Sequence, residues 1–106
     1  MSLKIIGQTD ESQERVLEAL KGYEAKHPRA KLEIKRQNSV SIRIMIVDSY
    51  FKSMSRADRH DYVLKYLEEL PDEVFGDITM LLLLTPEETK KSLAFMEFVD
   101  PIPSRL

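Results

Sequence analysis

The sequence predicts a single α+β domain in which a three-stranded sheet carries helices on one face. Three observations predict it: apolar residues recur at helical spacing in two long stretches, three other stretches read as strands, and 106 residues suit one domain. Hydrophobic residues make up 42% of the chain and charged residues 32%, which supplies both a core and a hydrated surface. We therefore expect the order α-β-β-α-β-α across residues 1–106, with 1–8 and 99–106 as flexible or peripheral tails.

The first predicted element is a helix. Val16, Leu20 and Tyr23 recur every three to four residues, the spacing that places side chains on one helical face. Asp10 is a typical helix cap, and Pro28 cannot continue a helix, so this helix should cover about 10–26.

A β-hairpin is predicted next. Leu32 and Ile34 alternate with charged residues, and a second alternation begins after the polar turn 37–39. The second strand places a row of β-branched residues on one face: Val40, Ile42, Ile44 and Ile46. Its opposite face is only partly polar, which leaves open whether it meets solvent or a partner; this face consists of Ser41, Arg43, Met45 and Val47.

A second long helix is predicted in the middle of the chain. Ser55 is a typical cap for it, and Pro71 stops the pattern after Leu70. Val63 and Leu67 mark its buried stripe. The stretch between this helix and the next apolar run has room only for a short turn.

A strand and a final helix complete the expected order. The apolar run Ile78–Leu84 has the length of a strand buried on both faces, so we expect it to be a central strand. The stretch Thr85–Glu88 reads as a capping box with proline at the first helical position, and it should begin a helix. The apolar positions of that helix are Leu93, Phe95, Met96 and Phe98.

Composition excludes much chemistry. With no cysteine, the chain has no disulfide, no thiol nucleophile and no cysteine metal site, and His27 and His60 lack the partners that a histidine metal site needs. The three glycines lie too far apart to cradle a phosphate. We expect no enzyme activity, no cofactor and no membrane span, and the absence of a secretory signal favours the cytoplasm.

Charge is divided unevenly along the chain. The formal net charge is −2, but residues 1–53 carry a net +3 and residues 54–106 a net −5. A weak nucleic-acid-binding regulator is therefore the alternative function, although a pI near 5.7 argues against it. Its candidate phosphate-contacting residues are Lys31, Lys35, Arg36, Arg43, Arg56 and Arg59.

The middle of the chain resembles the BolA family of small α/β proteins. Phe51, Arg59, His60 and Val63 match the spacing of the family's motif, and the following helix, strand and capping box come in the family's order. Two positions depart from the motif, because Ser53 replaces a glycine and Asp61 replaces an arginine. The element order is also similar to that of class II KH domains, but the chain has no Gly-x-x-Gly loop to clamp RNA.

The resemblance implies a [2Fe–2S] cluster shared with a monothiol glutaredoxin. The family holds it through a histidine at the start of the last strand and a cysteine or histidine in the hairpin loop, but Asp77 and the loop 37–39 stand at these positions here. We therefore expect a BolA-like, non-enzymatic regulatory domain in stress or redox regulation that binds a protein partner without the usual iron–sulfur ligation. A monothiol glutaredoxin-like protein is one candidate partner, and the expected contact residues are Arg59, His60 and Asp77.

Overall fold

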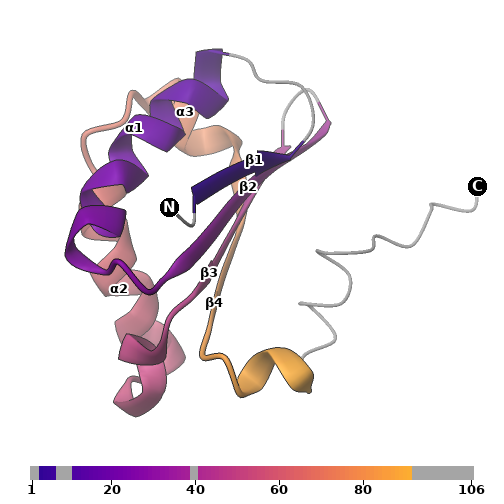
Figure 1. Ribbon diagram of the computed structural model, residues 1–106. Coiled ribbons are helices and arrows are strands. Elements are labelled where there is room, and N and C mark those ends of the chain that lie inside the picture. The colour runs from indigo at the N-terminus through magenta and orange to yellow at the C-terminus, as the bar shows by residue number, and fades with distance from the viewer. Residues whose placement is uncertain (1–2, 7–10, 39–40, 92–106) are drawn as a thin grey trace, which may run out of the picture.

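A four-stranded mixed sheet forms the centre of the molecule (Figure 1). The computed structural model describes residues 3–6, 11–38 and 41–91. The strands are β1 (Leu3–Ile6), β2 (Lys31–Asn38), β3 (Ser41–Val47) and β4 (Ile78–Leu84), and they lie side by side in sequence order. β2 and β3 form the predicted antiparallel hairpin, whereas β1 runs parallel to β2 and β4 parallel to β3.

Both parallel connections carry helices. α1 (Glu11–Lys26) joins β1 to β2, and η1 (Ser49–Ser53), α2 (Arg56–Leu67) and α3 (Asp72–Asp77) join β3 to β4. The three α-helices lie on the same face of the sheet (Figure 1). After β4 a single 3-10 turn, η2 (Glu88–Lys90), ends the described part of the chain.

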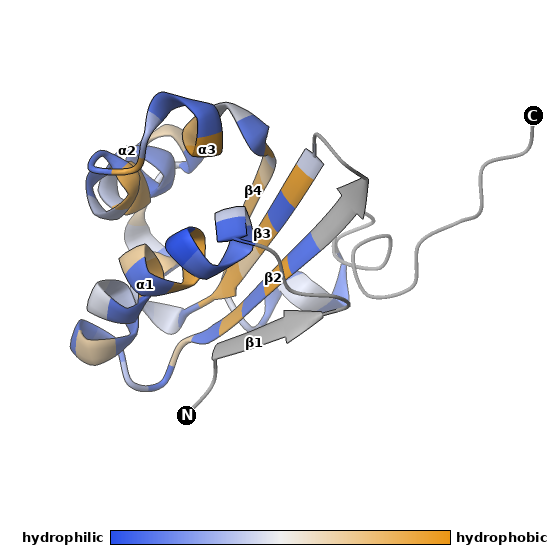
Figure 2. Cartoon of the chain, turned by 90° about the horizontal axis from the view of Figure 1, so that it is seen from above, coloured by the Kyte–Doolittle hydropathy of each residue, from blue (hydrophilic) through white to orange (hydrophobic). Residues whose placement is uncertain are grey.

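The main core lies between this helical layer and the sheet. The apolar stripe of α1 (Val16, Leu20 and Tyr23) and that of α2 (Val63 and Leu67) are fully buried. They pack on side chains that alternate along β2 and β3, which Figure 2 shows as alternating apolar and polar bands on β2. The buried strand residues are Leu32, Ile34, Ile42, Ile44 and Ile46.

The predicted fold class is confirmed. The domain is α+β, and the two predicted hairpin strands and the predicted strand 78–84 are present as β2, β3 and β4, with the helices on one face. β2 extends into the expected turn 37–39 as far as Asn38. The sheet gains a fourth strand from the region expected to be a tail, because residues 3–6 pair with the free edge of β2. A segment of four residues is too short for its alternation of apolar and polar residues to predict a strand. The other tail, 99–106, lies outside the described residues.

Two local expectations are corrected. Ile78–Leu84 is not a central strand: within the described sheet β4 pairs only with β3, and the two inner strands are β2 and β3. Its apolar residues fit this position because one set faces the main core and the other joins a second cluster on the opposite face. The expected turn after Pro71 is a short helix, α3, which inserts the buried side chain of Val74 into the core.

Candidate functional site

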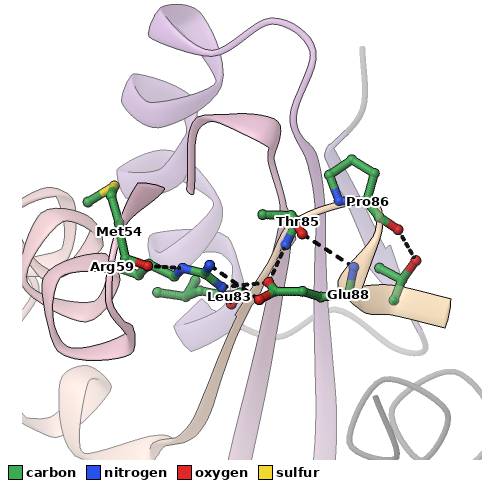
Figure 3. Close-up of polar contacts among 7 residues, drawn as sticks. Met54, Arg59, Leu83, Thr85, Pro86 and Glu88 are labelled. Carbon is green, nitrogen blue, oxygen red and sulfur yellow. Dashed lines mark hydrogen bonds and ion pairs between the residues drawn. The ribbon is translucent and has the colours of Figure 1, made fainter. Parts of the chain in front are cut away.

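Arg59 lies inside the domain, at the first turn of α2 (Figure 3). Its side chain is only 7% exposed and donates hydrogen bonds to the backbone carbonyls of Met54 and Leu83, both at 3.1 Å. The guanidinium carbon is also 5.7 Å from the centre of the Phe51 ring, which allows a cation–π contact. The residue therefore connects the start of α2 to the end of β4.

Glu88 completes this arrangement. Arg59 Nη1 and Nη2 lie 2.6 and 3.3 Å from the two carboxylate oxygens of Glu88, so the pair is bidentate. The same carboxylate accepts the backbone N–H of Thr85 at 2.8 Å, and the Thr85 hydroxyl accepts the backbone N–H of Glu88 at 3.3 Å. The predicted capping box is thus formed. The described residues that follow it make a 3-10 turn. The expected helix with Leu93–Phe98 lies outside the described residues.

The hydrogen bonds explain the acidity of Glu88. The Arg59 guanidinium, followed by the backbone N–H of Thr85, holds the pKa of the Glu88 carboxyl below its ordinary value, against the opposing effect of burial. Because its polar atoms are already engaged in the fold, Arg59 is not available to a partner or to a phosphate. It is therefore removed from both predicted interfaces, whereas its neighbour His60 is exposed.

Asp77 does not meet Arg59 and His60. It ends α3, immediately before β4, whereas Arg59 bonds to Leu83 near the other end of that strand. Leu83 lies six positions after Asp77, which corresponds to about 20 Å at 3.3 Å per residue. The three predicted contact residues therefore do not form one surface.

The basic residues predicted to contact phosphate do not lie on one surface either. Lys31 and Lys35 alternate with the buried residues of β2, so they share the helix-free face of the sheet with Arg43, which pairs directly with Lys35. Arg56 is exposed at the start of α2, in the helical layer on the opposite face. For Arg36 only the backbone is described. Glu33 lies between the two lysines on β2, so this face has no continuous basic strip.

A polar cluster that the sequence does not reveal surrounds His27. Its Nε2 is 2.6 Å from the hydroxyl of Tyr62, and its Nδ1 is 3.4 Å from Asp48. Tyr23 stacks on the imidazole at 4.4 Å and donates its hydroxyl to Asp48 at 2.6 Å. Asp48 and Tyr62 thus approach the two ring nitrogens of His27 from different elements of the fold.

The phenols of this cluster are poor nucleophiles. Burial, and then the hydrogen bond to Asp48, raises the pKa of Tyr23 far above its ordinary value. Burial, together with the hydrogen bond to Tyr66, raises the pKa of Tyr62 well above its ordinary value. Both hydroxyls therefore keep their protons at neutral pH and serve as hydrogen-bond donors within the fold.

The residues at the start of β4 do not fit an iron–sulfur cluster. The chain has no cysteine. His27 lies beside Asp48, which follows the last residue of β3. Ile78, at the start of β4, pairs near the other end of β3, so His27 is far from the start of β4. Within residues 3–6, 11–38 and 41–91, no three His, Asp or Glu side chains lie close enough to hold a metal ion. The same part of the chain includes no helix with the length and apolar character needed to cross a membrane.

A concave surface lies between α1 and the corner where α2 leads into α3. We call it the helical groove. It has a volume of about 850 Å³, and its apolar part is formed by Leu17, Ala19, Tyr66, Leu70 and Pro71. A second hollow continues it toward α3 and Asp77, since Glu11, Arg15 and Pro71 line both.

The helical groove is strongly acidic. Its single basic lining residue in the described chain, Arg15, is paired with Glu11 at 3.1 Å. The acidic residues that line the groove and its continuation are Glu11, Glu14, Glu18, Glu69, Asp72, Glu73 and Asp77. Of the three predicted contact residues, only Asp77 borders this surface.

Comparison with protein-family models, with curated proteins and with solved structures gave no match. The BolA-like resemblance of the sequence therefore stays a proposal. The fold and the geometry of the described residues carry the functional argument.

Proposed function

We propose that this chain is a non-enzymatic interaction domain of BolA-like type that binds a protein partner in a regulatory role. The helical groove carries the proposal, because it combines an apolar floor with acidic walls. Helix-binding grooves use the same combination of apolar anchors and complementary charge. A cytoplasmic location and a role in stress or redox regulation belong to the same proposal.

The chemistry of the groove specifies the partner. Leu17, Tyr66 and Leu70 offer apolar contact in the groove, and Glu14 and Glu69 are among the acidic residues that line it. A partner segment that matches both features is an amphipathic helix with a narrow apolar stripe flanked by lysine or arginine. The acidic surface repels nucleic acid, since the phosphate backbone needs positive charge.

The test uses a synthetic amphipathic helix made of leucine, alanine and lysine, labelled with a fluorophore. We expect the protein to bind this peptide in a fluorescence anisotropy titration, with weaker binding at high salt. Replacing both Glu14 and Glu69 with glutamine should weaken binding about fivefold, because two half-screened charge contacts of about 0.5 kcal/mol each are lost. Asp61→Gln, an exposed acidic position on α2 outside the groove lining, is the matched control and should change little.

Two further probes make the result specific. A peptide with glutamate in place of lysine should not bind, and labelled DNA or RNA should not shift at low salt. Equal binding of the basic peptide to the parent and to the Glu14→Gln, Glu69→Gln variant would contradict the assignment to the helical groove. A salt-dependent shift of nucleic acid would favour the alternative function instead.

A further inference from the structure

Gly22 is an exposed residue in the interior of α1, and it lines the helical groove. It lies more than one helical turn from the N-terminus of α1 and one turn from its C-terminus at Lys26. Glycine weakens a helix at such a position, because it loses more backbone freedom on folding than alanine does. Helix formation therefore does not explain why a glycine stands here.

Packing does not require a glycine at this position either. Gly22 has the ordinary helical backbone of α1, so no left-handed turn depends on it. A methyl group added at Gly22 would lie 3.7 Å from Cδ2 and 4.0 Å from Cε2 of Tyr66, which is ordinary van der Waals contact. Alanine would therefore fit the folded chain and would favour the helix.

Tyr66 lies opposite Gly22, and its ring is held in place by its neighbours. The ring centres of Tyr23 and Tyr62 are 5.3 and 5.7 Å from that of Tyr66, both in edge-on contact. The hydroxyls of Tyr62 and Tyr66 are also within hydrogen-bonding distance, at 3.4 Å. We call the gap between Gly22 and the Tyr66 ring the notch. Because these contacts fix the ring, the notch is preorganised to receive a ligand group.

The surroundings of the notch favour an aliphatic group. Its two sides are the bare backbone of Gly22 and the edge of an aromatic ring, and Leu17 and Leu70 line the same groove. The ammonium group of Lys26 lies 5.9 Å from the centre of the Tyr66 ring, so a basic side chain would be repelled at this point. The lysines of a partner helix belong instead at the acidic walls of the groove.

We propose that the notch receives one large aliphatic side chain of the partner helix, and that Gly22 determines how large this side chain is. The inference rests on the proposed function of the helical groove and names the position that makes it selective. A leucine of the partner would remove apolar surface from water against Tyr66, and any side chain at position 22 would take up the same space. Gly22 thus costs the helix stability and keeps the notch open.

The labelled leucine, alanine and lysine peptide tests the notch in the full-length protein. Gly22→Leu fills the gap with a good helix former, so we expect binding to weaken at least about tenfold while the urea midpoint does not fall. Gly22→Ala should weaken binding about threefold and raise the urea midpoint. Ala57→Leu adds similar bulk at an exposed position of α2 outside the groove lining, and this matched control should bind like the parent.

Peptides in which one leucine at a time is shortened to alanine identify the side chain that enters the notch. One of them should bind the parent more weakly than the full peptide does. Its affinity for Gly22→Leu should equal that of the full peptide, because the substitution in the protein and the shortening of the peptide remove the same contact. The other shortened peptides should show losses that add to that of Gly22→Leu.

The outcomes separate the notch from the proposed function. Equal binding of the full peptide to the parent and to Gly22→Leu, or losses that add for every shortened peptide, would overturn the notch and leave the helical groove as the docking site. A urea midpoint of Gly22→Ala below that of the parent would show that the fold itself needs the glycine, and would also overturn it. If the peptide did not bind the parent at all, the proposed function would fail and the notch with it.

Discussion

Replacing Arg59 with methionine should destabilise the domain strongly, although Arg59 belongs to a motif that resembles a functional signature. The substitution keeps much of the side-chain volume but removes the guanidinium. The backbone carbonyls of Met54 and Leu83 lose a charged donor at 3.1 Å, and the bond to Leu83 is buried. An arginine is therefore a structural connection here between α2 and β4.

The expected loss follows from these contacts. A hydrogen bond from a charged group contributes about 1.5 kcal/mol, so the two carbonyl bonds together account for about 3 kcal/mol. The ion pair adds less, because the Glu88 side chain is 44% exposed and water screens it. We expect Arg59→Met to lower the free energy of unfolding by about 3–4 kcal/mol.

Urea denaturation followed by circular dichroism measures this loss. Glu88→Gln removes the charge but retains a residue that completes a capping box, so it should cost under about 1 kcal/mol. His60→Ala, at the exposed neighbouring position, should stay within about 0.5 kcal/mol of the parent. If Arg59→Met were as stable as His60→Ala, or Glu88→Gln as unstable as Arg59→Met, the carbonyl bonds would not be the main contribution.

Three further predictions follow from the polar contacts. The pKa of Glu88 is lowered in the folded protein, so ionised Glu88 stabilises the fold at pH values above its unfolded pKa. This stabilisation should disappear as the pH falls through the lower folded pKa. Urea midpoints measured against pH should show the loss in the parent but not in Glu88→Gln. Tyr23→Phe removes the 2.6 Å hydrogen bond to Asp48 and should cost about 2 kcal/mol by the same assay. Since burial raises the pKa of Tyr62 above its ordinary value, stability should fall as the pH rises above about 10, where unfolded tyrosines ionise, and Tyr62→Phe should make that fall less steep.

Local patterns predict most of the fold. The helix 11–26, the hairpin of β2 and β3, and the strand 78–84 follow from spacing and alternation, and the Ser55 and Thr85 caps accept the expected backbone N–H groups. The order of the strands does not follow from such patterns. β1 pairs with β2 across the whole length of α1, and the edge position of β4 depends on which strands pair, which is a nonlocal property.

Side-chain roles are harder to predict than elements. A charged residue near a helix start is usually exposed, so Arg59 reads as surface, yet its acceptor Leu83 lies 24 positions away. His27 directly follows the last residue of α1, yet Asp48 and Tyr62 from other elements contact its ring. The helical groove escapes prediction for the same reason, since α1 and the α2–α3 corner each contribute only part of it.

The burial of the motif residues determines what the BolA-like resemblance can mean. Phe51 and Val63 are fully buried and Arg59 nearly so, which leaves His60 as the one exposed residue of the four that match. A pattern made largely of interior residues reflects how η1 and α2 pack against β4, so these residues specify packing and not a ligand. The partner should therefore be sought on a surface that this motif does not specify. The helical groove, with its acidic walls, is such a surface, and charge substitutions there should change binding where substitutions of the motif change stability.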